Sequence, residues 1–214
     1  MSLQLFLHPL SSYCHKVLTA FYENDIPFEV KRVDDPVVGR EWLELSPMRK
    51  FPLLRDPKRG QVIPESTIII EYLDLHYPGR TKLIPRDPDL AWQVRLRDRF
   101  FDNYLHTAVQ TFAGDHLRPK DKKDPYGVDQ AKAMFVSALG AVETEMADRT
   151  WAMADTFTLA DCAAAPALFY GNRFFGPFHQ THPNANAYLE RLMARPSYAR
   201  ALEEAKPFFN LLPK

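Results

Sequence analysis

The segment Ser11-Ser12-Tyr13-Cys14 follows a short apolar run, residues 3–7, and opens a stretch with helical periodicity. A helix N-terminus presents unpaired amide N–H groups and a partial positive charge, so it can stabilise an anion such as a thiolate. Thiol–disulfide proteins carry Cys-x-x-Cys at such a junction, but the first position here is Ser11. Its hydroxyl could instead donate a hydrogen bond to the thiolate of a bound substrate. The alternative is that Ser11 or Ser12 only caps the helix.

A hydrogen bond from a serine together with a helix N-terminus can supply the free energy needed to ionise a bound thiol. A free thiol has a pKa near 8.5, so ionising most of it at pH 7 requires lowering that pKa by about 2 units, or ~2.7 kcal/mol. A hydrogen bond to a charged group contributes ~1.5–3 kcal/mol, and a helix N-terminus ~0.3–1 kcal/mol. The two contributions together are sufficient.

A second candidate segment is Lys50-Phe51-Pro52. If the Phe51–Pro52 bond is cis, the backbone of Phe51 turns outward, and its N–H and C=O can pair with an extended peptide. Only ~5–6% of X-Pro bonds in folded proteins are cis. The alternative is a trans proline that begins an edge strand.

A third segment, Pro64-Glu65-Ser66-Thr67, precedes an apolar helical stretch, and we expect Ser66 to be its N-cap. The amides there suit a carboxylate, while Glu65 could accept an ammonium group. The alternative is plain capping. In Thr158-Leu159-Ala160-Asp161, a Thr with an acid three residues on has the form of a capping box, and here we favour the structural role.

The hydrophobic pattern predicts a small α/β domain, 1–78, a linker, 79–88, and an all-helical domain, 89–214. The first domain should be a mixed four-stranded sheet with helices on its faces. We expect strands at 3–7, 28–33, 51–54 and 61–63, and helices at 13–23, 39–45 and 66–76. Further helices are expected at 89–117, 128–147, 158–170, 184–194 and 197–206.

The composition is that of an ordinary soluble protein: 214 residues, 46% apolar and 25% charged, with 27 basic and 27 acidic side chains. Zero net charge argues against nucleic acid or an anionic membrane as the main partner. No apolar run approaches the ~18 residues that span a bilayer. Cys14 and Cys162 are the only cysteines and the histidines lack ligand spacing, so we expect no disulfide framework, no metal and a reducing, cytoplasmic setting.

These features occur together, in this order, in one family: the chain resembles the cytosolic glutathione transferases over 3–208. The resemblance implies a thioredoxin-like N-terminal domain and a helical C-terminal domain. His8-to-Val17 looks like the active-site turn of the serine-type, bacterial-like classes, with some similarity to the zeta class. It implies that Ser11, or Ser12 as second choice, contacts the glutathione sulfur.

The resemblance also assigns the remaining motifs. The Phe51-Pro52 pair matches one whose proline is cis, so Phe51 would pair with the cysteinyl part of glutathione and Lys50 would reach its glycyl carboxylate. Glu65-Ser66 matches the pair that holds the γ-glutamyl end. Thr158 and Asp161 match the family's capping box.

The implied function is conjugation of glutathione, as co-substrate, to small apolar electrophiles by a homodimer. Candidate lining residues are Tyr13, Phe101, Tyr104, His106, Phe112 and Phe175, each with core packing as the alternative. Asp98 or Asp102 could reach the glutathione ammonium of the partner subunit. Two other functions stay open: a glutathione-dependent isomerase (maleylacetoacetate isomerase-like) or thiol reductase using Cys14, and a non-catalytic ligand-binding or interaction protein.

Overall fold

The computed structural model describes residues 2–153 and 155–213, which form two compact units. The first unit contains the residues up to Ile84 together with Pro196–Asn210. The second contains Pro85–Arg195 and the residues from Leu211 onward. Within the described residues, no helix has the length and apolar character needed to cross a membrane.

The first unit is built on a mixed four-stranded sheet, as predicted. The strands are β1 (Leu3–Leu7), β2 (Phe28–Arg32), β3 (Leu53–Asp56) and β4 (Gln61–Pro64), in the order β2-β1-β3-β4. β1 pairs with β2 in parallel and with β3 antiparallel, and β3 and β4 form an antiparallel hairpin. Gly60, with φ of 65°, closes that hairpin in a left-handed conformation that glycine adopts at low cost.

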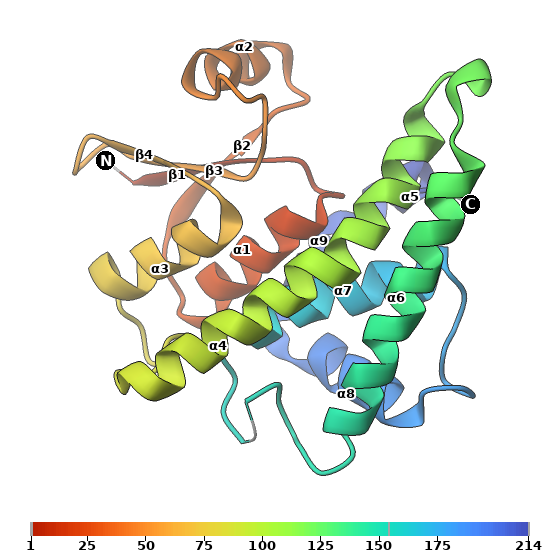
Figure 1. Cartoon of the computed structure of the whole chain (residues 1–214). Coiled ribbons are helices and arrows are strands. Elements are labelled where there is room, and N and C mark those ends of the chain that lie inside the picture. Colours follow the sequence, from red (N-terminus) through yellow and green to blue (C-terminus); the bar gives the residue numbers. More distant parts are fainter. Residues whose placement is uncertain (1, 154, 214) are drawn as a thin grey trace. The chain divides into compact units, whose positions relative to one another are not determined.

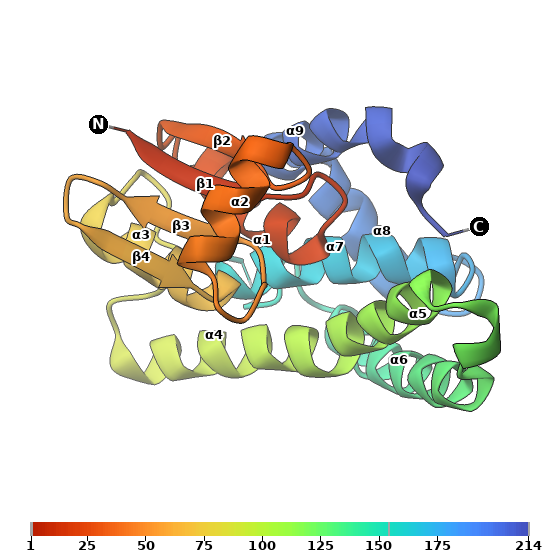
Figure 2. The same ribbon diagram turned by 90° about the horizontal axis from the view of Figure 1, so that it is seen from above.

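Three helices cover the sheet: α1 (Ser12–Glu23), α2 (Pro36–Leu45) and α3 (Ser66–His76). Figure 1 shows α1 and α3 on one side of the sheet and α2 on the other, and Figure 2 views the sheet from the side of α2. The core of this unit includes Leu5 and Phe6 of β1, Val17 and Phe21 of α1 and Ile70 of α3, which are all fully buried. α2 buries none of its residues.

Pro196–Asn210 are grouped with the first unit, although the sequence pattern placed them in the helical domain, 89–214. They form α9 (Pro196–Ala205) and most of the 3₁₀ segment η3 (Lys206–Leu211). α9 packs along α1 through Tyr198 and Ala201, both buried, and Ser197 Oγ donates to Glu23 Oε2 at 2.8 Å. An amphipathic pattern predicts a helix but does not say which neighbour receives its apolar face.

The second unit is all-helical: α4 (Pro88–Phe100), η1 (Phe101–His106), α5 (Thr107–Leu117), η2 (Lys120–Lys122), α6 (Pro125–Glu145), α7 (Leu159–Phe174) and α8 (Pro183–Ala194). α7 is its central element, with Ala163, Ala164, Ala165 and Leu168 completely buried. Small alanines allow neighbouring helices to approach it closely.

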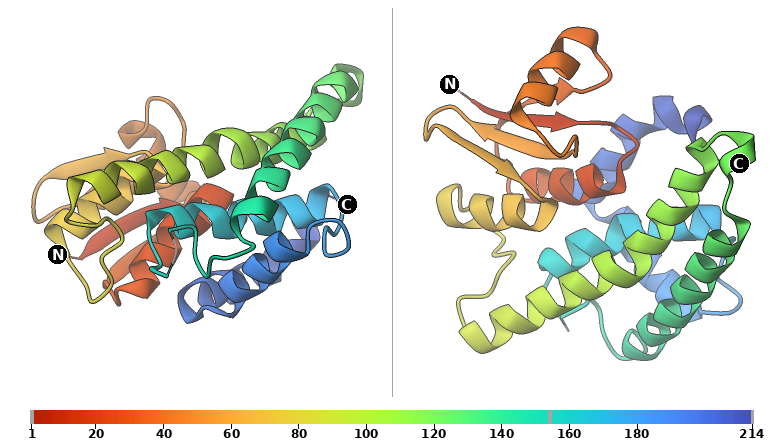
Figure 3. Two further views of the ribbon diagram at one scale, coloured as in Figure 1. Left: turned by 60° about the horizontal axis from the view of Figure 1, so that its bottom comes forward. Right: turned by 45° about the horizontal axis from the view of Figure 1, so that its top comes forward.

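The predicted single helix over 89–117 is drawn as one continuous helical ribbon in Figure 3, but η1 in its middle is a π-helix. Thr107 Oγ1 donates to the carbonyl of Asp102 at 3.1 Å, which satisfies a backbone acceptor in the wider turn. Stretches of this kind are rare and carry no simple periodic signal, so the pattern could not reveal it.

Other element boundaries differ by a few residues from the prediction. α2 begins at Pro36 rather than residue 39, because Asp35 Oδ1 caps it by accepting from the amides of Val37 and Val38 at 2.8 and 3.0 Å. β3 begins at Leu53 rather than Phe51.

Candidate active site

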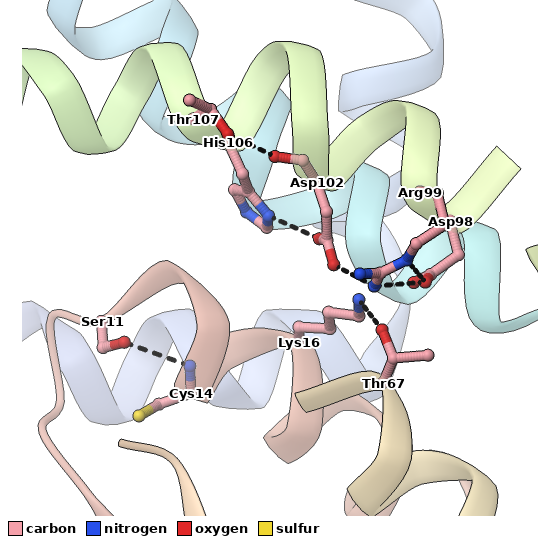
Figure 4. A network of polar contacts seen from close by, with 9 residues as sticks. All are labelled: Ser11, Cys14, Lys16, Thr67, Asp98, Arg99, Asp102, His106 and Thr107. Carbon is pink, nitrogen blue, oxygen red and sulfur yellow. Dashed lines mark hydrogen bonds and ion pairs between the residues drawn. The ribbon is translucent and has the colours of Figure 1, made fainter. Parts of the chain in front are cut away.

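The turn between β1 and α1 places Ser11 at the N-cap of α1. Ser11 has extended backbone angles, φ −76° and ψ 121°, and its Oγ accepts a hydrogen bond from the amide of Cys14 at 3.3 Å (Figure 4). Its own amide donates to the carbonyl of His8 at 3.0 Å. The capping role considered from the sequence is therefore present.

The Ser11 hydroxyl can still donate a hydrogen bond while it caps the helix. A hydroxyl oxygen that accepts from an amide still carries its own hydrogen for donation. Ser11 is half-buried at the positive end of α1, whereas Ser12 is the first helical residue and only 2% exposed. Of the two serines, Ser11 is the one that a ligand sulfur can approach at lower cost.

Cys14 is completely buried in the first turn of α1. Burial raises the pKa of its thiol to about 12, although hydrogen bonds involving the Ser11 side chain and the His8 backbone act in the opposite direction. The thiolate is the reactive form of cysteine, so this environment makes Cys14 a poor nucleophile.

The Phe51–Pro52 peptide bond is cis, as the resemblance implied. The chain before it is tied to α2: Trp42 Nε1 donates to the carbonyl of Lys50 at 3.0 Å, and Ser46 Oγ donates to the same oxygen at 3.1 Å. The Lys50 amide donates back to Ser46 Oγ at 3.2 Å. These two anchors were not among the predicted site residues, because nothing in the local sequence links α2 to Lys50.

Glu65, not Ser66, is the N-cap of α3, so the predicted cap is displaced by one residue. Glu65 has φ of 68°, a left-handed conformation that costs a non-glycine residue about 1–3 kcal/mol and concentrates at ligand sites. Its side chain is exposed and makes no capping hydrogen bond, while its carbonyl accepts from Ile69 at 2.8 Å. Ser66 is buried as the first helical residue.

A buried carboxylate, Asp56, joins the β3–β4 hairpin to α3. It accepts from the hydroxyls of Tyr72 at 2.7 Å and Tyr77 at 2.5 Å, and from the amides of Lys58 and Arg59. Burial alone would raise the pKa of Asp56, but the hydrogen bonds from Tyr77, Tyr72 and the two amides lower it overall. This network supports the helix that begins at Glu65-Ser66, and sequence reasoning missed it.

The helical unit holds most of the predicted electrophile-pocket residues in different surroundings. Phe101 is 1% exposed, which is typical of a core residue, and Tyr104 is 50% exposed. Phe112 packs against Phe174 and Phe175 at ring-centroid distances of 5.1 and 5.5 Å. Tyr13, in the first unit, is half-buried.

Asp98 and Asp102 belong to a polar chain on the inner face of α4 and η1. Arg99 Nε donates to Asp98 Oδ2 at 3.0 Å, and its Nη2 also bridges to Asp102 (Figure 4). Asp102 Oδ1 lies 3.0 Å from Nδ1 of His106, which is fully buried. The predicted lining residue His106 is thus oriented by a carboxylate.

The capping box at the start of α7 is present. The amide and hydroxyl of Thr158 donate to Asp161 Oδ2 at 2.8 and 3.2 Å. Asp161 Oδ1 accepts from the Ala152 amide at 2.8 Å and from the Tyr188 hydroxyl at 2.6 Å. This buried carboxylate therefore fastens α7 to α8 and to the preceding loop.

The mixed sheet, the serine-capped first helix and the cis-proline define a thioredoxin-like domain that is joined to a helical domain. Residues 5–81 match the model of the glutathione S-transferase N-terminal domain, and residues 100–196 match that of the C-terminal domain. The chain therefore belongs to the glutathione S-transferase family.

Individual relatives agree with this assignment but carry two kinds of name. A stringent starvation protein A homolog from Haemophilus ducreyi is 27% identical over 96% of this chain and 92% of its own length. Glutathione S-transferase U25 of Arabidopsis thaliana is 26% identical over 91% and 86%.

Solved structures of the same fold include proteins with glutathione or a derivative bound. A glutathione S-transferase from Methylobacterium radiotolerans in complex with glutathione sulfonate is 28% identical, with a TM-score of 0.79 over 94% of both chains. One from Methylobacillus flagellatus with glutathione bound is 25% identical, with a TM-score of 0.84 over 94% of this chain and 98% of its own.

Proposed function

We propose that the protein is a glutathione transferase in which the Ser11 hydroxyl donates a hydrogen bond to the thiolate of glutathione. The observation that carries this proposal is the position of Ser11 Oγ at the N-terminus of α1, where it accepts from Cys14 and keeps its hydrogen for a ligand. Family membership and the glutathione-bound relatives support glutathione as co-substrate.

The rest of the tripeptide has matching partners within the first unit. The backbone of Phe51 pairs with the cysteinyl part, Lys50 reaches the glycyl carboxylate, and Glu65-Ser66 holds the γ-glutamyl end. The exposed Glu65 carboxylate, which no capping bond engages, supports a role with the ammonium group. Because Lys50 is basic and Glu65 is acidic, the two residues fix the direction in which the tripeptide binds.

In the reaction, the thiolate sulfur attacks an electrophilic carbon and forms a C–S bond, and the leaving group departs with its electron pair. Ser11 stabilises the sulfur anion, and the bound geometry raises its effective concentration toward the electrophile. The electrophile is small and apolar, and Tyr104 and Phe112 are the lining residues that the helical unit contributes. The setting is cytoplasmic and reducing, which keeps Cys14 and Cys162 as buried thiols.

A second copy of the chain is the proposed partner. Trp92, Leu96 and Tyr104 are separated by four and eight residues along α4 and η1 and are 54%, 57% and 50% exposed. Such a stripe on one helical face is costly to leave in water, and a homodimer would cover it.

The test of the transferase proposal is turnover of glutathione with 1-chloro-2,4-dinitrobenzene by the wild type, Ser11→Ala and Ser12→Ala. We expect Ser11→Ala to lower turnover by about 10- to 100-fold, the loss of one hydrogen bond to a charged group, and Ser12→Ala to lower it far less. Equal activity of the wild type and Ser11→Ala would reject the role of Ser11.

A non-catalytic alternative is favoured by one observation: several relatives of similar length are named stringent starvation protein A homologs rather than transferases. In that case the protein would be an interaction module on the same fold. Glutathione bound without turnover of any electrophile in a broad panel would select it.

A further inference from the structure

His8 follows β1 and begins the turn of residues 8–11, here called the serine turn. It accepts two hydrogen bonds from backbone amides of that turn. Its carbonyl accepts the amide of Ser11 at 3.0 Å, and its ring nitrogen Nδ1 accepts the amide of Leu10 at 3.2 Å. Because Nδ1 is an acceptor, the ring is neutral and Nε2 carries its hydrogen. The conformation that presents Ser11 therefore depends on an uncharged imidazole.

The same ring also contacts the other half of the proposed glutathione site. It stacks on the ring of Phe51 with centroids 6.1 Å apart and planes at 29°, and Phe51 packs against Trp42 at 5.7 Å. One imidazole thus joins the serine turn to the residue that precedes Pro52, through a hydrogen bond on one side and a ring contact on the other.

The charged groups facing His8 come from the end of β2 and the residues that follow it. Asp34 favours the protonated ring and Arg32 opposes it, and the two are paired with each other at 2.5 and 3.1 Å. Phe51 adds no charge; the titratable groups at the serine turn are the Cys14 thiol, which keeps its proton, and the buried ring of His15, whose Nε2 lies 2.7 Å from the carbonyl of Pro9. Burial, the largest effect, lowers the pKa of His8, in agreement with a neutral resting form.

We propose that His8 is a positioning residue for the glutathione site, which holds the Ser11 turn in place while neutral and loosens that turn when protonated. A protonated ring has N–H donors at both nitrogens, so Nδ1 can no longer accept from Leu10 and the turn loses that bond. Affinity for the γ-glutamyl tripeptide then falls in the acid range. The inference rests on the proposed glutathione function and adds a proton-dependent control to it.

The binding test uses S-methylglutathione, whose thioether sulfur does not ionise, with calorimetry between about pH 5 and pH 7. We expect the wild type to lose about 2- to 10-fold in affinity on the acid side, the factor that corresponds to one hydrogen bond. His8→Asn places an amide oxygen near the Nδ1 position and does not titrate, so its affinity should change far less. His8→Phe keeps a ring for Phe51 but has no acceptor, so it should bind weakly over the whole range.

A second measurement separates failure of this inference from failure of the proposed function, because it needs no ligand. Hydrogen exchange at the Leu10 amide, corrected for the intrinsic pH dependence, should be faster in acid for the wild type and unaffected by pH in His8→Asn. If S-methylglutathione fails to bind at every pH while this exchange pattern holds, the proposed function is wrong and the role of His8 in the turn stands. Parallel pH dependence in the wild type and His8→Asn, or wild-type protection in His8→Phe, would overturn the inference.

Discussion

The hydroxyl oxygen of Ser11 accepts a hydrogen bond from the amide of Cys14 at 3.3 Å, so Ser11 caps the helix turn that contains Cys14. Ser11 is half-buried and Cys14 is completely buried. A ligand can therefore reach the Ser11 hydroxyl at this turn, whereas the Cys14 thiol is shielded from it.

The first prediction concerns that thiol. Burial raises the pKa of the Cys14 thiol to about 12, so the thiol stays protonated at pH 7. We expect iodoacetamide to label Cys14 in the native protein far more slowly than in the urea-unfolded chain, as followed by mass spectrometry. Cys162, equally buried, is the matched internal control. Rapid native labelling of Cys14, together with disulfide reduction that Cys14→Ser abolishes, would instead support a thiol reductase.

The second prediction is a pH dependence of stability from Asp56. Because its folded pKa lies below its ordinary value, its contribution is fully present above about pH 4 and is lost as the pH falls through the folded value. Asp56→Asn should lower the free energy of unfolding by about 1–3 kcal/mol at pH 7. The difference from the wild type should shrink below about pH 4 in urea titrations. The exposed Asp121→Asn is the control, and a constant difference at every pH would contradict the role of the ionised carboxylate.

The third prediction concerns the buried contact between Tyr188 and Asp161, 2.6 Å between oxygens. Tyr188→Phe leaves the ring in place but removes a donor to a carboxylate, which should cost about 1.5–3 kcal/mol of stability. Thermal and denaturant unfolding would measure it, with Tyr126→Phe, at a 74% exposed position, as the control. Equal losses in the two variants would mean that the hydroxyl contributes nothing specific.

The fourth prediction tests the proposed dimer. Replacing Leu96 by Glu places a charge in the centre of the exposed stripe on α4, so the mass measured by light scattering should fall from that of two chains to that of one. Leu117→Glu, at an 82% exposed position outside the stripe, should leave the mass unchanged. A wild type that is already monomeric at micromolar concentration would refute the proposal.

Local signals in the sequence revealed much of this arrangement. The alternating run in β1, the serine cap of α1 and the Thr158–Asp161 box are all encoded within a few neighbouring residues, so each could be predicted. The cis bond before Pro52 could be expected only from the resemblance, because tertiary context selects the isomer.

What escaped prediction joins residues far apart in the chain. Asp56 meets Tyr72 and Tyr77, 16 and 21 positions away, and no spacing rule connects the last residue of a strand to a later helix and its C-cap. The cap of α3 was misplaced because serine is the statistically favoured cap, whereas the left-handed Glu65 occupies that position here.

The most direct test of the central claim is the pKa of the glutathione thiol when bound, read from thiolate absorbance in the wild type, Ser11→Ala and Ser12→Ala. A hydrogen bond to the sulfur anion accounts for about 1–2 pKa units. We expect a bound thiol pKa well below its solution value in the wild type and in Ser12→Ala, and a return toward the solution value in Ser11→Ala. An identical thiol pKa in the wild type and Ser11→Ala would contradict the account.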